Sequence, residues 1–306
     1  MIKPSEERIA KGLWWDRNWP VLEGCSHVSP ACDNCFAAEY AHRFESSLPY
    51  LHGLTTPAGK WTGNVTMRAD QLDLPLRIKK PTVWFVAERS DLFHPSVPDE
   101  YLDRIFAAMA LCPQHTFMVL TKRPERMLGY LLGPRGKAPS WPLPNVWLGV
   151  TAENQEQADK RVPVLLQTPA AHRFVSVEPM LGPIDLTNLP VNKHERWNAF
   201  AYPVPNYPRV DWVICGLESG HNARPGHPIW VRALRDQCAA AGVPFFFKQW
   251  GEWIHELQAD FSSSPFSALA SRNAMYHVWE GGARSYRVGK KDAGRLLDGK
   301  EHLVFP

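Results

Sequence analysis

Short apolar runs, rich in β-branched and aromatic residues, alternate along the chain with helical stretches. This alternation is typical of a parallel β-sheet wrapped by helices. We therefore expect an α/β fold of the (β/α) TIM-barrel type, full or partial, and eight strands suit a closed barrel. The expected strands are residues 18–23, 64–68, 82–88, 115–122, 146–151, 173–178, 212–218 and 244–249. The expected helices are residues 35–45, 98–111, 124–131, 154–166, which starts on an Asn cap, and 229–241, which stops at Gly242.

Polar side chains gather where the expected strands end. In a (β/α) barrel the active site forms at the carboxyl ends of the strands, so the residues there are candidates for function. The first expected strand leads into Cys25, and the second ends at Arg68. The later strands end in Glu88, Arg89, Ser90 and Asp91, in Thr121, Lys122 and Arg123, in Thr151, in Glu178, in Glu218 and Ser219, and in Lys248 and Gln249.

The alternation of side chains across a strand predicts what lies beneath these terminal groups. If Glu178 and Glu218 face the inside of the barrel, so do Ser176 and Gly216, and Gly149 has the same relation to the end of the fifth strand. An ordinary barrel fills this level with bulky branched side chains, so these small residues predict a cavity at the polar end. The alternative is that the strand-end carboxylates form structural ion pairs with Arg68, Lys122 and Lys248.

Two segments depart from the alternation of strands and helices. Residues 189–209 are rich in proline and aromatic residues, and we expect them to be an insertion after the sixth strand. The tail contains a basic stretch at residues 286–300, which could meet phosphates, although a solvated surface is the favoured interpretation. The expected organisation is a barrel over residues 1–253, with a cysteine loop at 24–36, and a C-terminal extension over residues 254–306.

Composition and charge narrow the class of protein. The chain has 306 residues, of which 44% are hydrophobic, enough for one large domain or two small ones. Its formal net charge of +3 says little by itself about nucleic acid. No apolar run has the length of a signal peptide or approaches the ~20 residues that span a bilayer. We therefore expect a cytoplasmic protein with no membrane partner, in a compartment where thiols stay reduced.

Three cysteines lie close together, Cys25, Cys32 and Cys35, with the spacing C-x6-C-x2-C. Two thiols on a C-x2-C turn can bind one soft metal ion or cluster, and the third can reach the same point by looping back. Because no fourth cysteine lies nearby, the pattern favours an iron–sulfur cluster with one iron open to a ligand. The alternatives are a zinc site completed by His27 or His42, and three unconnected buried thiols. A disulfide would leave one thiol of the three unpaired.

The cysteines after the first strand and the polar strand ends resemble a radical S-adenosylmethionine enzyme. The C-x2-C half matches the usual motif of these enzymes, while the first gap is longer and no Gly-Gly-Glu follows residues 64–68. A closer resemblance is to a family of phage and prophage proteins of uncharacterised function that carry a three-cysteine motif. The stretches that carry this resemblance are residues 24–37, 90–95, 120–127, 147–154, 176–184, 216–220, 247–252 and 288–299.

The resemblance implies an enzyme with a [4Fe-4S] cluster bound by Cys25, Cys32 and Cys35, and with S-adenosylmethionine on the open iron. One electron from an electron donor then gives a 5′-deoxyadenosyl radical, while the protein supplies position, charge and exclusion of water. From their place at the strand ends, we expect six residues to contact the cofactor: Ser90, Asp91, Thr121, Lys122, Glu178 and Glu218.

Phage context, also implied by the resemblance, favours a nucleotide or nucleic-acid base that is modified or repaired, and a protein substrate stays open. The expected substrate contacts are Arg68, Arg123, Lys248 and Gln249, with Trp61, Trp250 and Trp253 as surfaces for stacking a base.

Two other functions fit parts of the sequence. A zinc-stabilised phage protein that binds nucleic acid without catalysis would use the strand-end charges on a phosphate backbone. A metal-free barrel hydrolase would use Glu178 and Glu218 as an acid/base pair, but this function leaves the three cysteines unexplained.

Overall fold

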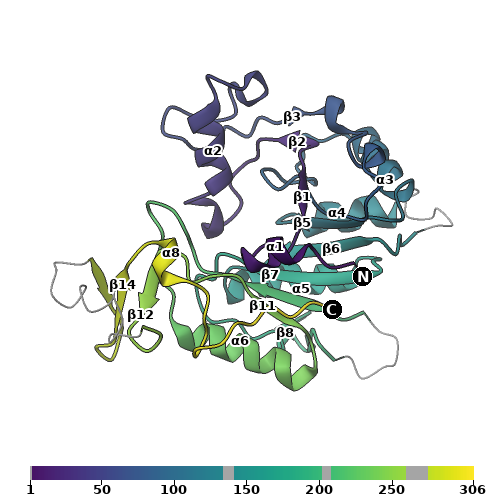
Figure 1. Cartoon of the computed structure of the whole chain (residues 1–306). Helices are drawn as coiled ribbons and strands as arrows, with labels where there is room; N and C mark the ends of the chain where they lie inside the picture. Colours follow the sequence, from purple (N-terminus) through teal and green to yellow (C-terminus); the bar gives the residue numbers. More distant parts are fainter. Residues whose placement is uncertain (1, 134–140, 202–207, 260–274) are drawn as a thin grey trace.

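The computed structural model describes residues 2–133, 141–201, 208–259 and 275–306. Its main element is a sheet of seven parallel strands in the order β1-β4-β5-β6-β7-β10-β11 (Figure 1). The sheet is curled into a half-barrel, so the fold is a partial barrel. Its strands are β1 (Arg17–Trp19), β4 (Val83–Val86), β5 (Thr116–Thr121), β6 (Val146–Thr151), β7 (His172–Val177), β10 (Trp212–Cys215) and β11 (Phe245–Phe247).

The expectation of a closed barrel with eight strands is wrong. Within the described residues, β1 and β11 are the two edges of the sheet and do not pair with each other. The second expected strand, 64–68, contains only β3 (Thr66–Met67), which pairs antiparallel with β2 (Leu22–Glu23) outside the main sheet. The first expected strand is divided into β1 and β2 because Pro20, which has no amide hydrogen, interrupts the ladder.

The five expected helices are all present. They are α2 (Phe36–Phe44), α3 (Asp99–Ala110), α4 (Pro124–Leu132), α5 (Gln155–Gln167) and α6 (Pro228–Ala241), and a short α1 (Glu6–Ala10) precedes β1. Asn154 caps α5 by accepting a hydrogen bond of 3.0 Å from the Gln157 amide. Gly242 ends α6 in the left-handed conformation with a φ of 65°. None of the described helices is long and apolar enough to cross a membrane.

Side chains alternate between the two faces of the half-barrel. In β10, Val213 and Cys215 join the core cluster that contains the buried residues of α3, α4, α5 and α6, whereas Trp212 and Ile214 lie on the concave face. An aromatic cluster fills the concave face with Trp14, Trp15, Phe85, Trp147, Phe174, Trp212, Phe246 and Phe305. Both ends of the chain therefore contribute to the lining of the half-barrel, and Figure 1 shows both termini at the sheet.

Three smaller parts extend from the half-barrel. In the first, α2 packs around Ala41, Leu51 and Leu54. In the second, β8 (Leu189–Pro190) pairs antiparallel with β9 (Arg196–Trp197) inside the expected insertion, of which residues 202–207 lie outside the described residues. In the third, β12 (Trp253–His255), β14 (Arg284–Arg287) and β13 (Tyr276–Val278) form an antiparallel sheet, followed by α8 (Lys290–Ala293). Residues 260–274 of the expected extension also lie outside the described residues.

Candidate functional site

A cavity of about 420 Å³ lies at the carboxyl ends of the parallel strands. Its lining comes from the cysteine loop and from residues at or just after the ends of β4, β5, β6, β7, β10 and β11. The expected cavity is therefore confirmed. Large aromatic residues fill the concave face below it, while Thr151, Ser176 and Lys248 stand at its level. At Gly149 the space is filled, because the Phe174 ring lies 2.5 Å from where a Cβ would be.

The three cysteines of the loop line this one cavity as free, partly buried thiols. The loop leaves β2 at Gly24, where a φ of 86° and the Asn64 carbonyl, 2.4 Å from an added Cβ, leave room for glycine alone. Cys32 ends a 3₁₀ turn, and Cys35 is the N-cap residue of α2, so the C-x2-C pair is fixed by two short elements. The chain's other cysteines, Cys112, Cys215 and Cys238, are buried in the core.

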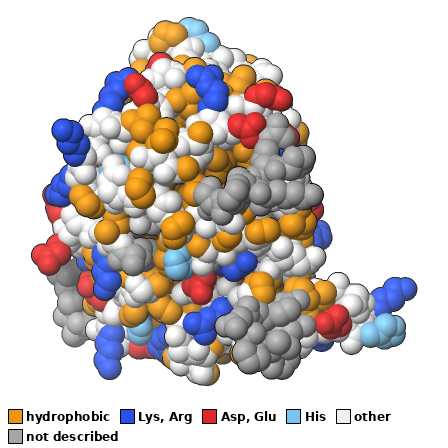
Figure 2. All heavy atoms as spheres, turned by 90° about the vertical axis from the view of Figure 1, so that its right-hand side faces the viewer, with side chains coloured by type: hydrophobic (Ala, Val, Ile, Leu, Met, Phe, Trp, Pro, Cys, Tyr) orange, Lys and Arg blue, Asp and Glu red, His pale blue; other side chains and the backbone are white. Residues whose placement is uncertain are grey.

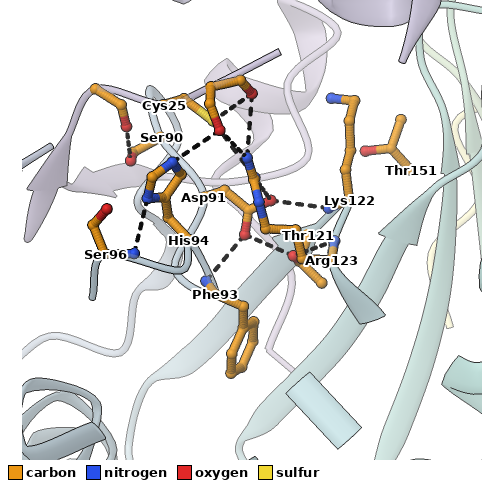
Figure 3. A network of polar contacts seen from close by, with 12 residues as sticks. Cys25, Ser90, Asp91, Phe93, His94, Ser96, Thr121, Lys122, Arg123 and Thr151 are labelled. Carbon is orange, nitrogen blue, oxygen red and sulfur yellow. Dashed lines mark hydrogen bonds and ion pairs between the residues drawn. The ribbon is translucent and has the colours of Figure 1, made fainter. Parts of the chain in front are cut away.

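An ion pair with little access to water lies beside Cys25 (Figure 3). Arg123 Nη1 is 2.7 Å from Asp91 Oδ2 and 3.6 Å from Cys25 Sγ, and Nη2 donates to the carbonyl and hydroxyl of Ser26. Burial and the Asp91 carboxylate raise the pKa of the Cys25 thiol to about 11, although Arg123 partly opposes them. The metal-free thiol therefore holds its proton at neutral pH, and a bound metal would displace it.

Asp91 is held by three further donors, and its position fixes that of Arg123. The Thr121 hydroxyl donates at 2.6 Å, and the Phe93 and Lys122 amides donate at 3.0 and 3.1 Å. The Lys122 ammonium takes no part in this network and points away from it in Figure 3. Among the described residues it forms no hydrogen bond or ion pair, so the cavity contains an uncompensated positive charge near Cys25.

Arg224 connects the cysteine loop to the half-barrel. Its guanidinium donates to Glu218 Oε1 at 2.6 Å and to Oε2 at 2.8 Å, and also to the Pro30 carbonyl and to Asp33. Asn34, between Cys32 and Cys35, donates to Glu218 as well, at 3.1 Å. The Glu218 side chain is buried, whereas the Arg224 side chain is 34% exposed, so only the carboxylate of this pair is removed from water.

A second buried carboxylate supports the same loop. The amide of Ala31 donates to Glu153 Oε1 at 3.3 Å, and Arg161 donates to Glu153 Oε2 at 2.9 Å. Glu153 is fully buried and Arg161 is almost so. The positions of the C-x2-C thiols are therefore set by two ion pairs that originate at the ends of β6 and β10.

The opposite wall of the cavity contains a second group of charges. Lys248 Nζ lies 2.6 Å from Glu178 Oε1 and 5.4 Å from the centre of the Trp15 ring. Glu88 follows Ala87, a residue with a φ of 53°, an uncommon left-handed backbone for a side chain with a Cβ. Burial raises the pKa of Glu88, whose carboxylate accepts from the Asn18 amide. This turn brings the segment after β4 to the cavity.

The structure brings most of the expected site residues together. The cavity lining includes Cys25, Cys32 and Cys35, all six expected cofactor contacts, and Arg123 and Lys248 of the expected substrate contacts. It does not include Arg68, which pairs with Asp70 and lies 3.8 Å from the centre of the Tyr50 ring, or the buried Gln249. Trp61 also lines the cavity, whereas Trp250 and Trp253 are buried and hydrogen-bonded to backbone carbonyls.

The alternative of structural ion pairs is correct in part. Glu178 pairs with Lys248 as that alternative states, but Glu218 pairs with Arg224, which lies outside the expected strands. Neither Arg224 nor Lys290, which lines the cavity from α8, lies at the end of an expected strand. The only signal for Lys290 was its place in a basic stretch of the tail.

The donors that line the cavity are three cysteine thiols, the donor type that iron–sulfur clusters use. In the described part of the chain, no group of three or more His, Cys, Asp or Glu side chains is arranged to hold one metal ion. His27 bonds to Asp33 at 2.7 Å and His42 to Thr55 at 3.3 Å. In an iron–sulfur cluster each cysteine binds a different iron, so the thiols need to line one cavity without converging on one point.

Comparison with known proteins gives one family and a loose structural likeness. The profile of the family described as protein of unknown function DUF5131 matches residues 10–306. Two solved structures of spore photoproduct lyase, a cysteine-to-serine mutant and a tyrosine-to-phenylalanine mutant, share 12% identity with TM-scores of 0.39 and 0.36. Each match covers 90% of this chain and 69% of the other. Scores of this size do not establish a common fold. No curated protein matches the sequence.

Proposed function

The chain belongs to the DUF5131 family, whose function is unknown. From the site we propose that it is a radical S-adenosylmethionine enzyme acting on a nucleotide or a nucleic-acid base. One observation carries the proposal: three free thiols line the same cavity as the polar groups at the carboxyl ends of a parallel half-barrel. Soft thiolate donors suit iron–sulfur clusters, and three of them leave one iron of a [4Fe-4S] cluster available to a small ligand.

The three cysteines and Arg123 provide the cluster site in this proposal. Cys25, Cys32 and Cys35 would hold the cluster, which with bound S-adenosylmethionine and an external one-electron donor would supply radical chemistry for removing a hydrogen atom from the substrate. Arg123, fixed by Asp91, lies 3.6 Å from the Cys25 sulfur and partly offsets the effects of burial and of Asp91 on the pKa of that thiol.

Lys122 and the opposite wall act on the small-molecule ligand. The free Lys122 ammonium is suited to the carboxylate of S-adenosylmethionine, because it lines the cavity near Cys25 and has no partner of its own in the described structure. The pair Glu178–Lys248 and the hydroxyls of Thr151 and Ser176 offer hydrogen bonds to the rest of the ligand. The aromatic floor below excludes water from the reacting atoms.

The test is anaerobic purification or reconstitution, followed by iron and sulfide analysis. The wild-type protein should hold about four irons per chain and show the broad visible absorption of a cluster. On reduction with S-adenosylmethionine, it should release methionine and 5′-deoxyadenosine. Cys25→Ala, Cys32→Ala and Cys35→Ala should each lose iron, while Cys112→Ala, which removes a core thiol, should keep it. A colourless protein that holds one zinc per chain in place of iron would refute the proposal.

Lys122 gives a test of the ligand position. Lys122→Gln should keep its iron but bind S-adenosylmethionine about tenfold more weakly, since one charge-assisted hydrogen bond is lost. Lys160→Gln, which removes an exposed lysine of α5, is the control and should leave the affinity unchanged. Equal affinities of the wild type and Lys122→Gln would mean that Lys122 does not contact this ligand. Titration calorimetry of the reconstituted protein measures both constants.

The zinc-stabilised nucleic-acid-binding alternative has less support. Binding to the phosphate backbone of a nucleic acid needs a broad basic surface. Figure 2 draws the face that lies away from α2 and α8, and on this face Lys and Arg side chains are interspersed with Asp and Glu and with apolar side chains. In addition, the strand-end cations Arg123 and Lys248 already form ion pairs with Asp91 and Glu178.

A further inference from the structure

Lys290 carries a positive charge to the cavity from the C-terminal part of the chain. It is the first residue of α8, it lines the cavity, and it remains accessible to solvent. Among the described residues its ammonium forms no hydrogen bond or ion pair. The next residue, Lys291, is exposed and does not line the cavity. Of two adjacent lysines, one is therefore directed to the site and the other to solvent.

A second lysine lies close to the first. Partial removal from water lowers the pKa of Lys290, and the charge of Lys248 lowers it further, against the carboxylates of Glu178 and Glu252. Lys248 is itself bonded to Glu178 at 2.6 Å. Glu178 bonds directly to Lys248, and Glu88 and Glu252 add negative charge nearby, but none of these carboxylates bonds to Lys290 among the described residues. The Lys290 ammonium is therefore the group on this wall that can donate its hydrogen bonds to an anion.

Two aromatic side chains that are not buried in the core also line the cavity. Phe36, the first residue of α2, is 56% exposed although it lines the cavity, and Trp61 lines it as a partly buried ring. In Figure 1, α2 and α8 lie on facing sides of the half-barrel's open end. An exposed aromatic ring near a cationic site is the combination that binds a base and its phosphate, because a ring offers a stacking surface to any base.

We propose that the mouth of the cavity binds a nucleotide phosphate, held by Lys290 and Lys248, with the base against Phe36 and Trp61. This inference rests on the proposed function and specifies its substrate: a 5′-phosphorylated nucleoside, free or as one unit of a single strand. A phosphate, with up to two negative charges, matches two ammonium groups better than a carboxylate does. The C-terminal extension then forms part of the substrate site.

The test uses the reconstituted protein with S-adenosylmethionine present. The probes are deoxynucleoside 5′-monophosphates, the corresponding nucleosides and a short single-stranded oligodeoxynucleotide. Nucleotides should bind at least about tenfold more tightly than nucleosides, the amount expected for one charge-assisted contact. Lys290→Gln should remove that advantage without changing nucleoside binding, Lys290→Arg should keep it, and Lys291→Gln should match the wild type. Trp61→Leu should weaken the binding of nucleosides and of nucleotides by the same factor.

The oligonucleotide distinguishes a free nucleotide from a strand. If a strand is the substrate, the oligonucleotide should bind more tightly than the monophosphates, and Lys290→Gln should reduce the salt slope of its binding by about one. If a free nucleotide is the substrate, the monophosphates should bind more tightly. Equal binding of nucleotides and nucleosides, or equal losses in Lys290→Gln and Lys291→Gln, would overturn the inference.

Iron content separates this inference from the proposed function. A protein that holds a cluster and cleaves S-adenosylmethionine but shows no phosphate preference contradicts the inference alone. A protein that never assembles a cluster but binds nucleotides in a Lys290-dependent way contradicts the proposed chemistry and leaves the phosphate site in place. Iron content and nucleotide binding are therefore measured on the same protein preparations.

Discussion

Asp91 accepts four hydrogen bonds beside Cys25, from Phe93, Thr121, Lys122 and Arg123. Its side chain is 6% exposed and that of Arg123 is 12% exposed. Removal of either partner would leave the other charge in a poorly solvated place without compensation, which costs far more than the loss of a surface pair. The stability of the loop that holds Cys25 is thus tied to this one carboxylate.

Asp91→Ala should lower the free energy of unfolding by about 3–5 kcal/mol, the range for breaking a buried ion pair from one side. Denaturant titration of the metal-free protein measures it without any contribution from a cluster. The control is Asp70→Ala at a pair with Arg68 on the surface, where the Asp70 side chain is 58% exposed and a change below about 1 kcal/mol is expected. Equal losses in the two variants would show that the Asp91–Arg123 pair is not desolvated as described.

The roles of single residues were harder to predict from the sequence than their positions. Strand-end alternation correctly placed Asp91, Thr121 and Glu178 at one cavity. It could not show that Thr121 bonds to Asp91, or that Glu218 is matched by Arg224. Asp91 and Arg224 lie on loops, whose course no periodic pattern specifies. A polar group at a strand end can therefore already have a hydrogen-bond or ion-pair partner that the sequence does not show.

At the level of elements, the loop at 24–36 is held by contacts that reach it from two strand ends. Arg224 alone donates to Glu218, to Asp33 and to the Pro30 carbonyl. A planar guanidinium can make these contacts at once, whereas a lysine ammonium cannot reproduce the fork. Arg224 is therefore a positioning residue for the C-x2-C thiols.

Arg224→Gln should release iron from the reconstituted protein to a chelator several-fold faster than the wild type, because the contacts that Arg224 makes from Glu218 to Pro30 and Asp33 are lost and only Asn34 still connects the loop to Glu218. The iron-release rate of Arg224→Lys should lie between those of the wild type and Arg224→Gln. Arg232→Gln removes an arginine that pairs with Asp298 away from the loop, and its release rate should stay at the wild-type value. Visible absorbance followed over time gives the rates. Identical rates for Arg224→Gln and Arg232→Gln would mean that the loop does not depend on Arg224.

The sheet of the C-terminal segment contains a histidine that responds to pH. His255 on β12 is 1% exposed, its Nδ1 accepts from the Leu257 amide, and its ring lies 4.7 Å from that of His227. Burial, followed by the nearby His227, lowers the pKa of His255 to about 4, against a smaller opposing effect of Glu256. Below about pH 6.5 the unfolded chain takes up a proton here that the folded protein refuses, so stability falls as the pH decreases toward 4.

The His255→Asn substitution isolates this contribution, because the asparagine oxygen can still accept from the Leu257 amide. Between pH 7 and pH 5 the wild type should lose about 2 kcal/mol more of its unfolding free energy than the variant, at about 1.36 kcal/mol per pH unit below 6.5. Denaturant titrations at three pH values measure the two slopes. Parallel slopes would show that His255 is protonated as readily in the fold as in the unfolded chain.

The elements themselves were largely predictable, and their pairing was not. All five expected helices are present and seven of the eight expected strands contribute to the main sheet, because apolar runs and caps such as Asn154 are local signals. Residues 64–68 also form a strand, but its partner is β2 rather than a member of the main sheet. Which strand pairs with which is a long-range property, and the count of eight therefore suggested a closure that the half-barrel does not have.

For the whole molecule, the missing closure raises the question of what covers the concave face. A closed barrel fills its interior with its own strand residues. Here Trp14 and Trp15 arrive from before β1, and Phe305 packs against Trp212 and Phe246 at ring distances of 5.2 Å each. Segments from both ends of the chain thus complete a core that seven strands leave open. The same aromatic residues form the floor below the cavity.

Phe305 therefore offers a test of the half-barrel as a single cooperative unit. Phe305→Ala should lower the free energy of unfolding by about 3 kcal/mol, as for a large aromatic side chain removed from a core. Val304→Ala, one residue earlier and 53% exposed, should change it by less than about 0.5 kcal/mol. Phe305 contacts Trp212 on β10 and Phe246 on β11. Its loss should therefore lower the denaturant concentration at the midpoint of unfolding by the same amount whether unfolding is followed by tryptophan fluorescence or by far-ultraviolet circular dichroism. If Phe305→Ala unfolded at the wild-type denaturant concentration, the C-terminal residues would not be part of the core, and the concave face would need another cover.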